Sequence, residues 1–168
     1  MSAFLDDLEA AVPALRRYAR ALTRDADRAD DLVQDCLERA IAKQGLWRPL
    51  GPLRPWLYRI MVNLHRNDER RRRRAPEIRD LDEPGFEPST PPSQGAHLAL
   101  AETARALDRL PAEQREALLL VVTEGLSYAE AAAVLDIPQG TLMSRIGRAR
   151  ETLRTMADGT QPKLRTVK

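Results

Sequence analysis

The sequence predicts an all-α protein with two small helical domains joined by a flexible linker. Apolar residues recur at spacings of three and four over long stretches, β-branched residues are scarce, and no convincing alternating strand pattern is present. Residues 75–95 hold five of the twelve prolines and five acidic residues, a composition that buries little apolar surface. We therefore expect a first domain over residues 1–74, the linker over 75–95, a second domain over 96–156 and a flexible tail over 157–168.

The first domain is expected to begin with two amphipathic helices. Pro13 suits the first position of a helix, and apolar residues follow at helical spacing from Leu15 to Leu22. Asp25 can cap the next helix, whose apolar pattern repeats over nearly four turns between Ala29 and Ile41.

A loop and a third helix complete this domain. Residues 45–53 contain two glycines and two prolines, which predicts a loop, and Pro55 is expected to start a helix that continues into the arginine run 70–74. One face of this helix carries aromatic, amide and cationic side chains at spacings of three and four, a combination suited to single-stranded nucleic acid. The alternatives are that Trp56 packs in the core, that the loop is a plain connector and that the arginine run only solubilises a helix end. The candidate residues for a melted strand are Trp47, Arg48, Arg54, Trp56, Arg59, Asn63, Arg66 and Arg70.

The second domain ends in a predicted helix-turn-helix. Pro111 can open a helix and Gly125 can stop it. Ser127 and Glu130 then fit a capping box, and Pro138 ends the short helix that follows. The inner face of that short helix is expected to hold Ala129, Ala132, Ala133 and Leu135, and the buried stripe of the next helix Leu142, Ile146, Ala149 and Leu153.

The second helix of this pair has the composition of a DNA reader. Arginine pairs bidentately with guanine, and serine or threonine contacts bases or phosphates in the major groove. A plain helical bundle with a solvated arginine face is the alternative interpretation. The candidate contacts to duplex DNA are Ser127, Tyr128, Thr141, Ser144, Arg145 and Arg148.

Acidic side chains line the outer face of the helix at 29–41. Such a stripe would repel DNA, so it is either a solvated face or a docking surface for a basic protein. Its members are Asp31, Gln34, Asp35 and Glu38.

Several classes of function are disfavoured by the sequence. A single cysteine, Cys36, precludes an internal disulfide, and His65 and His97 have no second metal ligand at a suitable spacing. No apolar run approaches the roughly 20 residues of a membrane span, and the first residues do not resemble a secretion signal. Motifs for phosphate binding or nucleophilic catalysis are missing. We therefore expect a cytoplasmic protein that is not an enzyme and has no cofactor, no metal, no membrane contact and no small-molecule substrate.

Three segments, in this order, resemble the extracytoplasmic-function group of bacterial sigma-70 factors. ALTRDADRADDLVQDCLERA at 21–40 is similar to the first conserved segment of that family, and RPWLYRIMVNLHRNDERRRRR at 54–74 to its promoter-melting helix. The two motifs within 107–150, LDRLPAEQREALLL and GLSYAEAAAVLDIPQGTLMSRIGRAR, resemble its C-terminal domain. The amino-acid sequences of residues 13–25 and of the C-terminal segment look most like those of the alphaproteobacterial general-stress branch.

The resemblance implies that the two domains bind different promoter elements. The N-terminal domain would capture the −10 promoter element as a melted strand, and the helix-turn-helix would read the −35 element as duplex. Core RNA polymerase would separate the two domains to the promoter spacing, and an anti-sigma factor would hold the free protein inactive. The family role places polymerase contacts at Asp31, Leu32, Gln34, Asp35 and Glu38.

Two features depart from the family pattern, and two rival functions stay open. Gly147 lies inside the recognition helix, at a cost of about 1 kcal/mol relative to alanine. The loop at 45–53 is proline-rich, so base contacts do not transfer to it residue by residue. The rivals are a stand-alone helix-turn-helix regulator and a sigma mimic that sequesters an anti-sigma factor.

Overall fold

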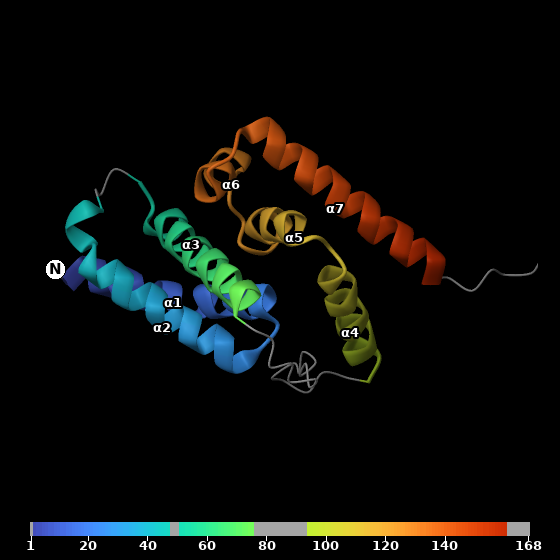
Figure 1. Cartoon of the computed structure of the whole chain (residues 1–168), viewed down its shortest axis with the longest axis horizontal. Helices are drawn as coiled ribbons and strands as arrows, with labels where there is room; N and C mark the ends of the chain where they lie inside the picture. The colour runs from blue at the N-terminus through green and yellow to red at the C-terminus, as the bar shows by residue number, and fades with distance from the viewer. Residues whose placement is uncertain (1, 48–50, 76–93, 161–168) are drawn as a thin grey trace, which may run out of the picture.

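The computed structural model describes residues 2–47, 51–75 and 94–160. Within these ranges the chain is almost entirely helical and contains no strand, as predicted, and it forms two groups of helices that lie side by side (Figure 1). The first group holds α1 (Ser2–Thr23), α2 (Ala26–Ala42), η1 (Gln44–Leu46) and α3 (Leu53–Arg74). The second holds α4 (Gln94–Asp108), α5 (Ala112–Leu118), η2 (Leu119–Thr123), α6 (Tyr128–Leu135) and α7 (Gln139–Thr160).

Helix α1 is longer than the sequence predicted. It begins at Ser2, and Pro13 lies inside it, so the predicted start at Pro13 was wrong. Phe4, Leu8 and Leu15 are all buried on one face of this helix. Their burial extends the apolar face across Pro13 and outweighs the one backbone hydrogen bond that a proline removes.

The core of the first group lies between α1, α2 and α3. The rings of Tyr18 and Tyr58 meet edge to face at 5.1 Å, and both side chains are fully buried. Cys36 is also fully buried, as the sequence predicted, and its Sγ lies 3.5 Å from the carbonyl oxygen of Leu57. The predicted cap of α2 is confirmed, since the carboxylate of Asp25 accepts a hydrogen bond of 2.9 Å from the backbone N–H of Arg28.

Helix α3 begins at Leu53, two residues before the predicted start at Pro55. Leu53 is buried, which anchors the first turn, and the helix continues to Arg74 through the arginine run. Residues 48–50 of the preceding loop and residues 76–93 of the expected linker lie outside the described residues.

The predicted turn signals of the second group are confirmed. The Ser127 hydroxyl accepts from the Glu130 N–H at 3.1 Å, and the Glu130 carboxylate accepts from the Ser127 N–H at 2.8 Å. Gly125 and Asp136 both adopt left-handed backbone angles, with φ of 69° and 54°, and end the segments before them.

The buried face of α6 differs from the prediction. Ala129 and Ala133 are exposed, whereas Ala131 and Val134 are buried together with the expected Ala132 and Leu135. Helix α6 packs against both α7 and α3. The prediction considered contact with α7 alone, so it placed the buried face on the wrong side of the helix. The short helix therefore joins the two groups.

Helix α7 confirms most of the predicted stripe but not the predicted end. Leu142, Ile146 and Ala149 are buried and Leu153 is half-buried. The helix continues to Thr160, so the expected tail at 157–168 is helical over its first four residues, and 161–168 lie outside the described residues.

A short π-helix, η2, follows α5 and positions one acidic residue. The N–H of Glu124 donates to the carbonyl of Leu119 at 3.0 Å, which closes a wider turn than an α-helix has. The side chain of Glu124, just after this turn, has no solvent exposure. Since α1 contacts η2 and α3 contacts α6, this part of the second group lies against the first.

Candidate nucleic-acid interface

The outer face of α7 is open to solvent. Ser144 and Arg148 are exposed and Thr141 is half-buried, as expected for a helix that enters a DNA groove. Met143 is also exposed, with 52% of its surface accessible, and was not among the predicted contacts. A Cβ atom at position 147 would have no neighbouring atom within 4 Å, so packing inside the protein does not require glycine there.

Arg145 does not share this open face. Its Nη2 lies 3.4 Å from Oε2 of Glu113 on α5, and its side chain is only 19% exposed. In the free protein Arg145 therefore turns toward α5 and is less open than Ser144 and Arg148, and its contact with DNA stays a prediction. Because Glu113 is well exposed, this ion pair is weak and can be exchanged for a phosphate.

The start of α6 is occupied by its own cap. The Ser127 hydroxyl already accepts a backbone hydrogen bond, although the residue is exposed, and Tyr128 packs against the core with part of its surface free. Both residues lie at the N-terminal end of α6, where backbone N–H groups favour an anion.

The predicted melted-strand residues that the structure describes fall into three groups. Arg59, Asn63 and Arg70 on α3 are exposed. Trp47 and Trp56 are half-buried and pack against the core, and the ring of Trp47 lies 5.5 Å from that of Phe4. Arg48 lies outside the described residues, and the other two arginines, Arg54 and Arg66, contact the second group of helices.

Glu124 gathers three partners from the first group. Arg17 donates to its carboxylate through Nη2 at 2.8 Å and through Nε at 3.1 Å, and the Tyr58 hydroxyl also donates to it. Arg54 donates to the backbone carbonyl of Glu124 at 3.1 Å, with its guanidinium carbon 5.8 Å from the centre of the Tyr58 ring. Glu124 was not among the predicted site residues, although one signal was present: it is an acidic residue that follows the apolar run 117–122 after a single threonine.

The surroundings of Glu124 shift the pKa values of its partners. Burial is the main cause that raises the pKa of Tyr58 to about 12; the hydrogen bond from Arg54 opposes it, and the bond to Glu124 adds to it. The hydrogen bond to Glu124 is the largest influence on Arg17 and raises its pKa. At neutral pH the cluster therefore consists of two guanidinium groups, a neutral phenol and the carboxyl group that they share.

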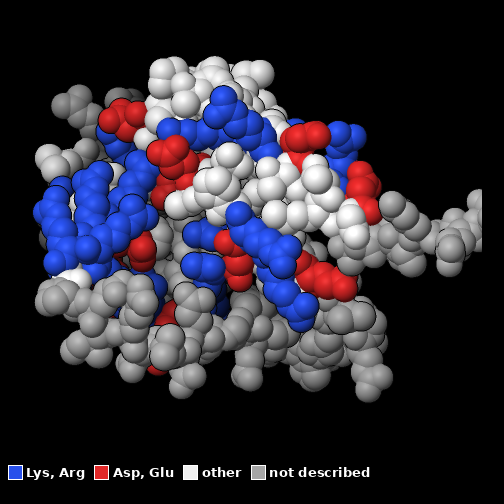
Figure 2. All heavy atoms as spheres, turned by 45° about the vertical axis from the view of Figure 1, so that its right-hand side comes forward, with Lys and Arg blue, Asp and Glu red and all other residues white. Residues whose placement is uncertain are grey.

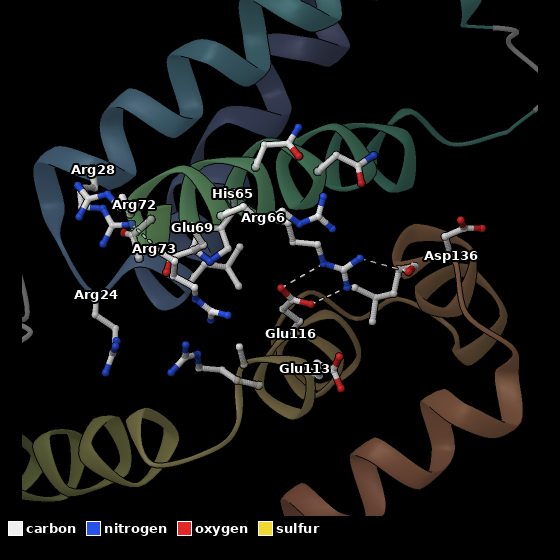
Figure 3. Close-up of a pocket in the computed structure, with 18 of the residues that line it drawn as sticks. Arg24, Arg28, His65, Arg66, Glu69, Arg72, Arg73, Glu113, Glu116 and Asp136 are labelled. Carbon is white, nitrogen blue, oxygen red and sulfur yellow. Dashed lines mark hydrogen bonds and ion pairs between the residues drawn. The ribbon is translucent and has the colours of Figure 1, made fainter. Parts of the chain in front are cut away.

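Glu116 forms a second connection between the two groups of helices. Arg66 Nη2 donates to its carboxylate at 2.7 Å, and Nη1 donates to the carbonyl of Leu135 at 3.5 Å (Figure 3). The side chain of Glu116 is 6% exposed and that of Arg66 is 29% exposed. Desolvation lowers the pKa of Arg66, but the hydrogen bond and the charge of Glu116 outweigh it and leave the pKa raised.

The acidic stripe on α2 lies at the surface. Asp31, Gln34, Asp35 and Glu38 are exposed, and the Gln34 amide donates to Glu38 at 3.0 Å. Leu32 is only 7% exposed and belongs to the core. The polymerase contact that the family resemblance implies for it stays a prediction. The spacing of Leu32 matches the apolar stripe of α2, which explains the burial.

Two family models match this chain, the sigma2 domain of PhyR over residues 8–62 and sigma-70 region 4 over residues 100–153. Among curated proteins, the ECF RNA polymerase sigma factor EcfG of Rhodopseudomonas palustris is 48% identical over 151 residues, which cover 88% of this chain and 81% of EcfG. The chain belongs to the extracytoplasmic-function sigma factors of RNA polymerase.

Solved structures place this sigma factor within the family. The sigma factor RpoE of Bartonella quintana, solved with the anti-sigma factor NepR, matches with a TM-score of 0.79 and 36% identity over 96% of this chain and all of RpoE. CnrH, solved with the cytosolic domain of CnrY, matches with a TM-score of 0.71 and 31% identity over 95% of this chain and 90% of CnrH. The likeness to EcfG and RpoE places the sigma factor in the alphaproteobacterial general-stress branch.

The described residues offer neither a metal site nor a membrane-spanning helix. No group of three or more histidine, cysteine or acidic side chains in these ranges could hold a metal ion. In the same part of the chain, none of the helices combines the length and the apolar character that a membrane crossing requires.

Proposed function

We propose that this sigma factor directs bacterial RNA polymerase to the promoters of a stress response, with its two groups of helices reading two promoter elements. The observation that carries the proposal is that one chain presents an open helix-turn-helix face and, on a separate helix, an exposed row of Arg59, Asn63 and Arg70. A duplex reader alone has no use for the second surface. The proposed boundaries are 1–74 for the −10 domain, 75–95 for the linker, 96–156 for the −35 domain and 157–168 for the tail.

The −35 element would be read by α7 in the major groove. Arg148 is the best candidate for a bidentate contact to guanine, because it is exposed and has no ion pair among the described residues. Ser144 and Thr141 would contact neighbouring bases or phosphates. Ser127, Tyr128 and Arg145 would hold the backbone from the sides, Arg145 after it releases Glu113.

The −10 element would be captured as a melted strand along α3. Arg59, Asn63 and Arg70 are open to a strand in the free protein, and the half-buried Trp56 offers part of a ring for stacking. Trp47 and Arg48 would contribute from the preceding loop. Arg66 would become fully available only after the second group of helices moves away, and Arg54, which is exposed, would then be released from Glu124.

Capture of unstacked bases would supply the free energy for melting, and no hydrolysis is required. The protein is thus proposed to act without enzymatic chemistry and without a cofactor. Its site of action would be the cytoplasm, where RNA polymerase works.

Core polymerase would bind the exposed acids of α2. Asp31, Asp35 and Glu38 with Gln34 form a negative surface suited to a basic helical partner, and Leu32 would support that surface from the core. Because RpoE was solved with the anti-sigma factor NepR and CnrH with CnrY, an anti-sigma factor is the proposed source of control.

The direct test is transcription in vitro with core polymerase over a genomic template, followed by mapping of the start sites. The proposal predicts starts at a limited set of promoters that share two spaced elements and are absent with core polymerase alone. Binding to core polymerase without any specific start would contradict it.

A sigma mimic is the second candidate, and one observation favours it. The family model that matches residues 8–62 is named for PhyR, and PhyR of Bartonella quintana was solved as an anti-anti-sigma factor with NepR. That structure is 18% identical to this chain and supports the fold alone. A mimic would bind an anti-sigma factor but neither core polymerase nor promoter DNA, whereas a stand-alone regulator would bind its duplex without polymerase.

A further inference from the structure

A cavity of about 980 Å³ lies between the two groups of helices. The C-terminal half of α3 and the turn between α1 and α2 form one wall, and α5 with the turn between α6 and α7 forms the other (Figure 3). Eight arginines and four acidic residues line it, an excess of four positive charges. On the face drawn in Figure 2, basic side chains gather densely, with fewer acidic ones among them.

The acids of the lining do not neutralise this excess. Glu116 is held by Arg66, Glu69 by Arg28 and Glu113 by Arg145, so three of the four acids already have an arginine partner.

Three lining arginines, Arg70, Arg73 and Arg115, form no ion pair among the described residues. A fourth, Arg24, forms one long ion pair among the described residues, with its Nε 3.7 Å from Oδ1 of Asp108. Both side chains of that ion pair are well exposed. The cavity therefore holds several cationic groups whose charge is not balanced within the described protein.

Arg115 is the strongest sign that an anion belongs here. It is only 8% exposed, and its Nε, which is fully buried, has no hydrogen-bond partner. Burial and then the positive charge of Arg24 lower the pKa of Arg115. A buried guanidinium without a full set of acceptors is costly, and an oxyanion in the cavity would provide the missing acceptors.

Several other cations line the same cavity. Figure 3 shows Arg24, Arg28, Arg72 and Arg73 at one end of the cavity, with Arg24 coming from the turn between α1 and α2. Arg28 and Arg72 both contact Asp68, at 3.4 and 3.3 Å, so a single carboxylate serves more than one guanidinium at this end.

We propose that this cavity binds a compact small molecule with two or more linked phosphate groups, held by Arg24, Arg73 and Arg115. The volume is within the range of small-molecule sites, roughly 300–1,000 Å³, and can admit a nucleotide as well as an inorganic phosphate chain. Because the ligand would touch both groups of helices, it would stabilise their present arrangement. That consequence for promoter binding rests on the proposed function, whereas the binding itself does not.

The position of the cavity favours a small ligand over DNA. Arg115 is buried between the two groups of helices, out of reach of phosphates on the outside of a duplex. If the groups separate to read two promoter elements, the walls move apart and the cavity ceases to exist. A ligand that needs both walls must therefore bind the closed protein.

The test is isothermal titration of the full chain with inorganic pyrophosphate, tripolyphosphate and guanosine diphosphate, with sodium sulfate at equal ionic strength as the control anion. We expect one site per chain, with a dissociation constant below about 1 mM for at least one phosphate ligand and no saturable binding of sulfate. The inorganic and nucleotide arms show whether the phosphates alone or a nucleoside as well is recognised. If no phosphate ligand shows saturable binding at a concentration of about 5 mM, the proposal is wrong.

Two variants and a matched control assign the site. Arg115→Gln and Arg73→Gln should each weaken binding roughly tenfold or more, because each removes a charge-assisted contact to phosphate. Arg39→Gln, an exposed arginine of α2 outside the cavity, should leave binding within about twofold, since remote surface charges are screened. Arg73 is exposed, so its variant should fold even if Arg115→Gln does not. Equal effects of Arg39→Gln and Arg73→Gln would overturn the proposal.

Two competitors distinguish other anions. A hexaglutamate peptide and a single-stranded DNA of ten nucleotides are titrated under the same conditions. If either displaces the phosphate ligand and depends on Arg115 to the same degree, the cavity belongs to a protein or nucleic-acid surface and the proposal fails. If phosphate binds through Arg115 while transcription with core polymerase fails, the site stands and the proposed function is wrong.

Discussion

Helices α7 and α3 both carry arginines that sequence periodicity assigns to DNA, but these arginines have different neighbours. On α7, Arg148 extends into solvent. On α3, Arg54 ends at Glu124 and Arg66 ends at Glu116, both of which are buried and come from the other group of helices. The free protein thus leaves the proposed −35 surface open and occupies part of the proposed −10 surface.

The difference indicates that promoter capture requires a change of arrangement. Hydrogen bonds to charged groups contribute about 1.5–3 kcal/mol each when their partners are buried. The contacts that Arg54 and Arg66 make with the second group of helices must therefore be given up before α3 is fully free.

The largest expected effect is that of Glu124→Gln. The change keeps the shape of the side chain but removes the charge shared by Arg17 and Arg54, and it should reduce the stability of the closed protein by about 2 kcal/mol. Urea unfolding followed by the fluorescence of Trp47 and Trp56 measures it. Glu151→Gln is the matched control, because Glu151 pairs with Arg154 on an exposed surface of α7 and should cost less than about 0.5 kcal/mol. An equal loss of unfolding free energy in both variants would show that Glu124 does not stabilise the closed protein.

The second prediction separates the two arginines of the recognition helix. Arg148→Ala should weaken binding of polymerase holoenzyme to a −35 duplex by about 1–3 kcal/mol, the range for loss of a bidentate base contact. Arg145→Ala should cost less, since Arg145 must first give up Glu113. Both variants should bind core polymerase normally. A larger effect of Arg145→Ala in a gel-shift titration would reverse the assignment of the faces.

The third prediction concerns the acidic stripe. Asp35→Arg should weaken association with core polymerase by about tenfold, because like charges oppose each other across an interface. Glu9→Arg introduces the same change of charge at an exposed position of α1 and should have little effect. Fluorescence anisotropy with labelled protein gives both affinities. Unchanged binding of Asp35→Arg would move the polymerase contact away from α2.

The smallest expected effect is a pH dependence at His65. Burial lowers the pKa of His65 below 6.5, against the charges of Glu69 and Glu116, which raise it. Between the lowered pKa and 6.5 the unfolded chain binds more protons than the folded one, so stability rises as pH increases toward 6.5 and levels off above it. His65→Gln should flatten this rise in urea unfolding measured between about pH 5 and 7.5. An unchanged slope would show that other groups cause it.

Local features of the fold could be predicted from the sequence, because each depends on residues a few positions apart. The capping box of Ser127 and Glu130, the cap at Asp25 and the buried Leu142 and Ile146 are of this kind. The start of α1 was missed because Pro13 was weighed as a boundary, whereas the burial of residues before it decides the outcome.

The connections between the two groups of helices could not be predicted. Arg66 and Glu116 are 50 residues apart, and Tyr58 and Glu124 are 66 apart, so no helical period relates them. Periodicity assigned Arg66 to a nucleic-acid face because it cannot show that a second group of helices contacts this side chain. Periodicity found the acidic stripe and the apolar stripe of α2, where Leu32 is buried; only the family resemblance named Leu32 as a polymerase contact.

The central claim is that the free protein is closed and opens on polymerase. Energy transfer between dyes on Ala26→Cys in α2 and Ala112→Cys in α5 measures this directly. Both positions are exposed, and Ala112 lines the same cavity as Arg24, two residues before Ala26. Native Cys36 is buried, and burial raises its pKa to about 12, so it will not react with the dyes. We predict high transfer efficiency in the free protein, a clear fall when core polymerase and promoter are added, and a lower starting value with Glu124→Gln. Efficiency that is the same before and after polymerase binds would contradict the account.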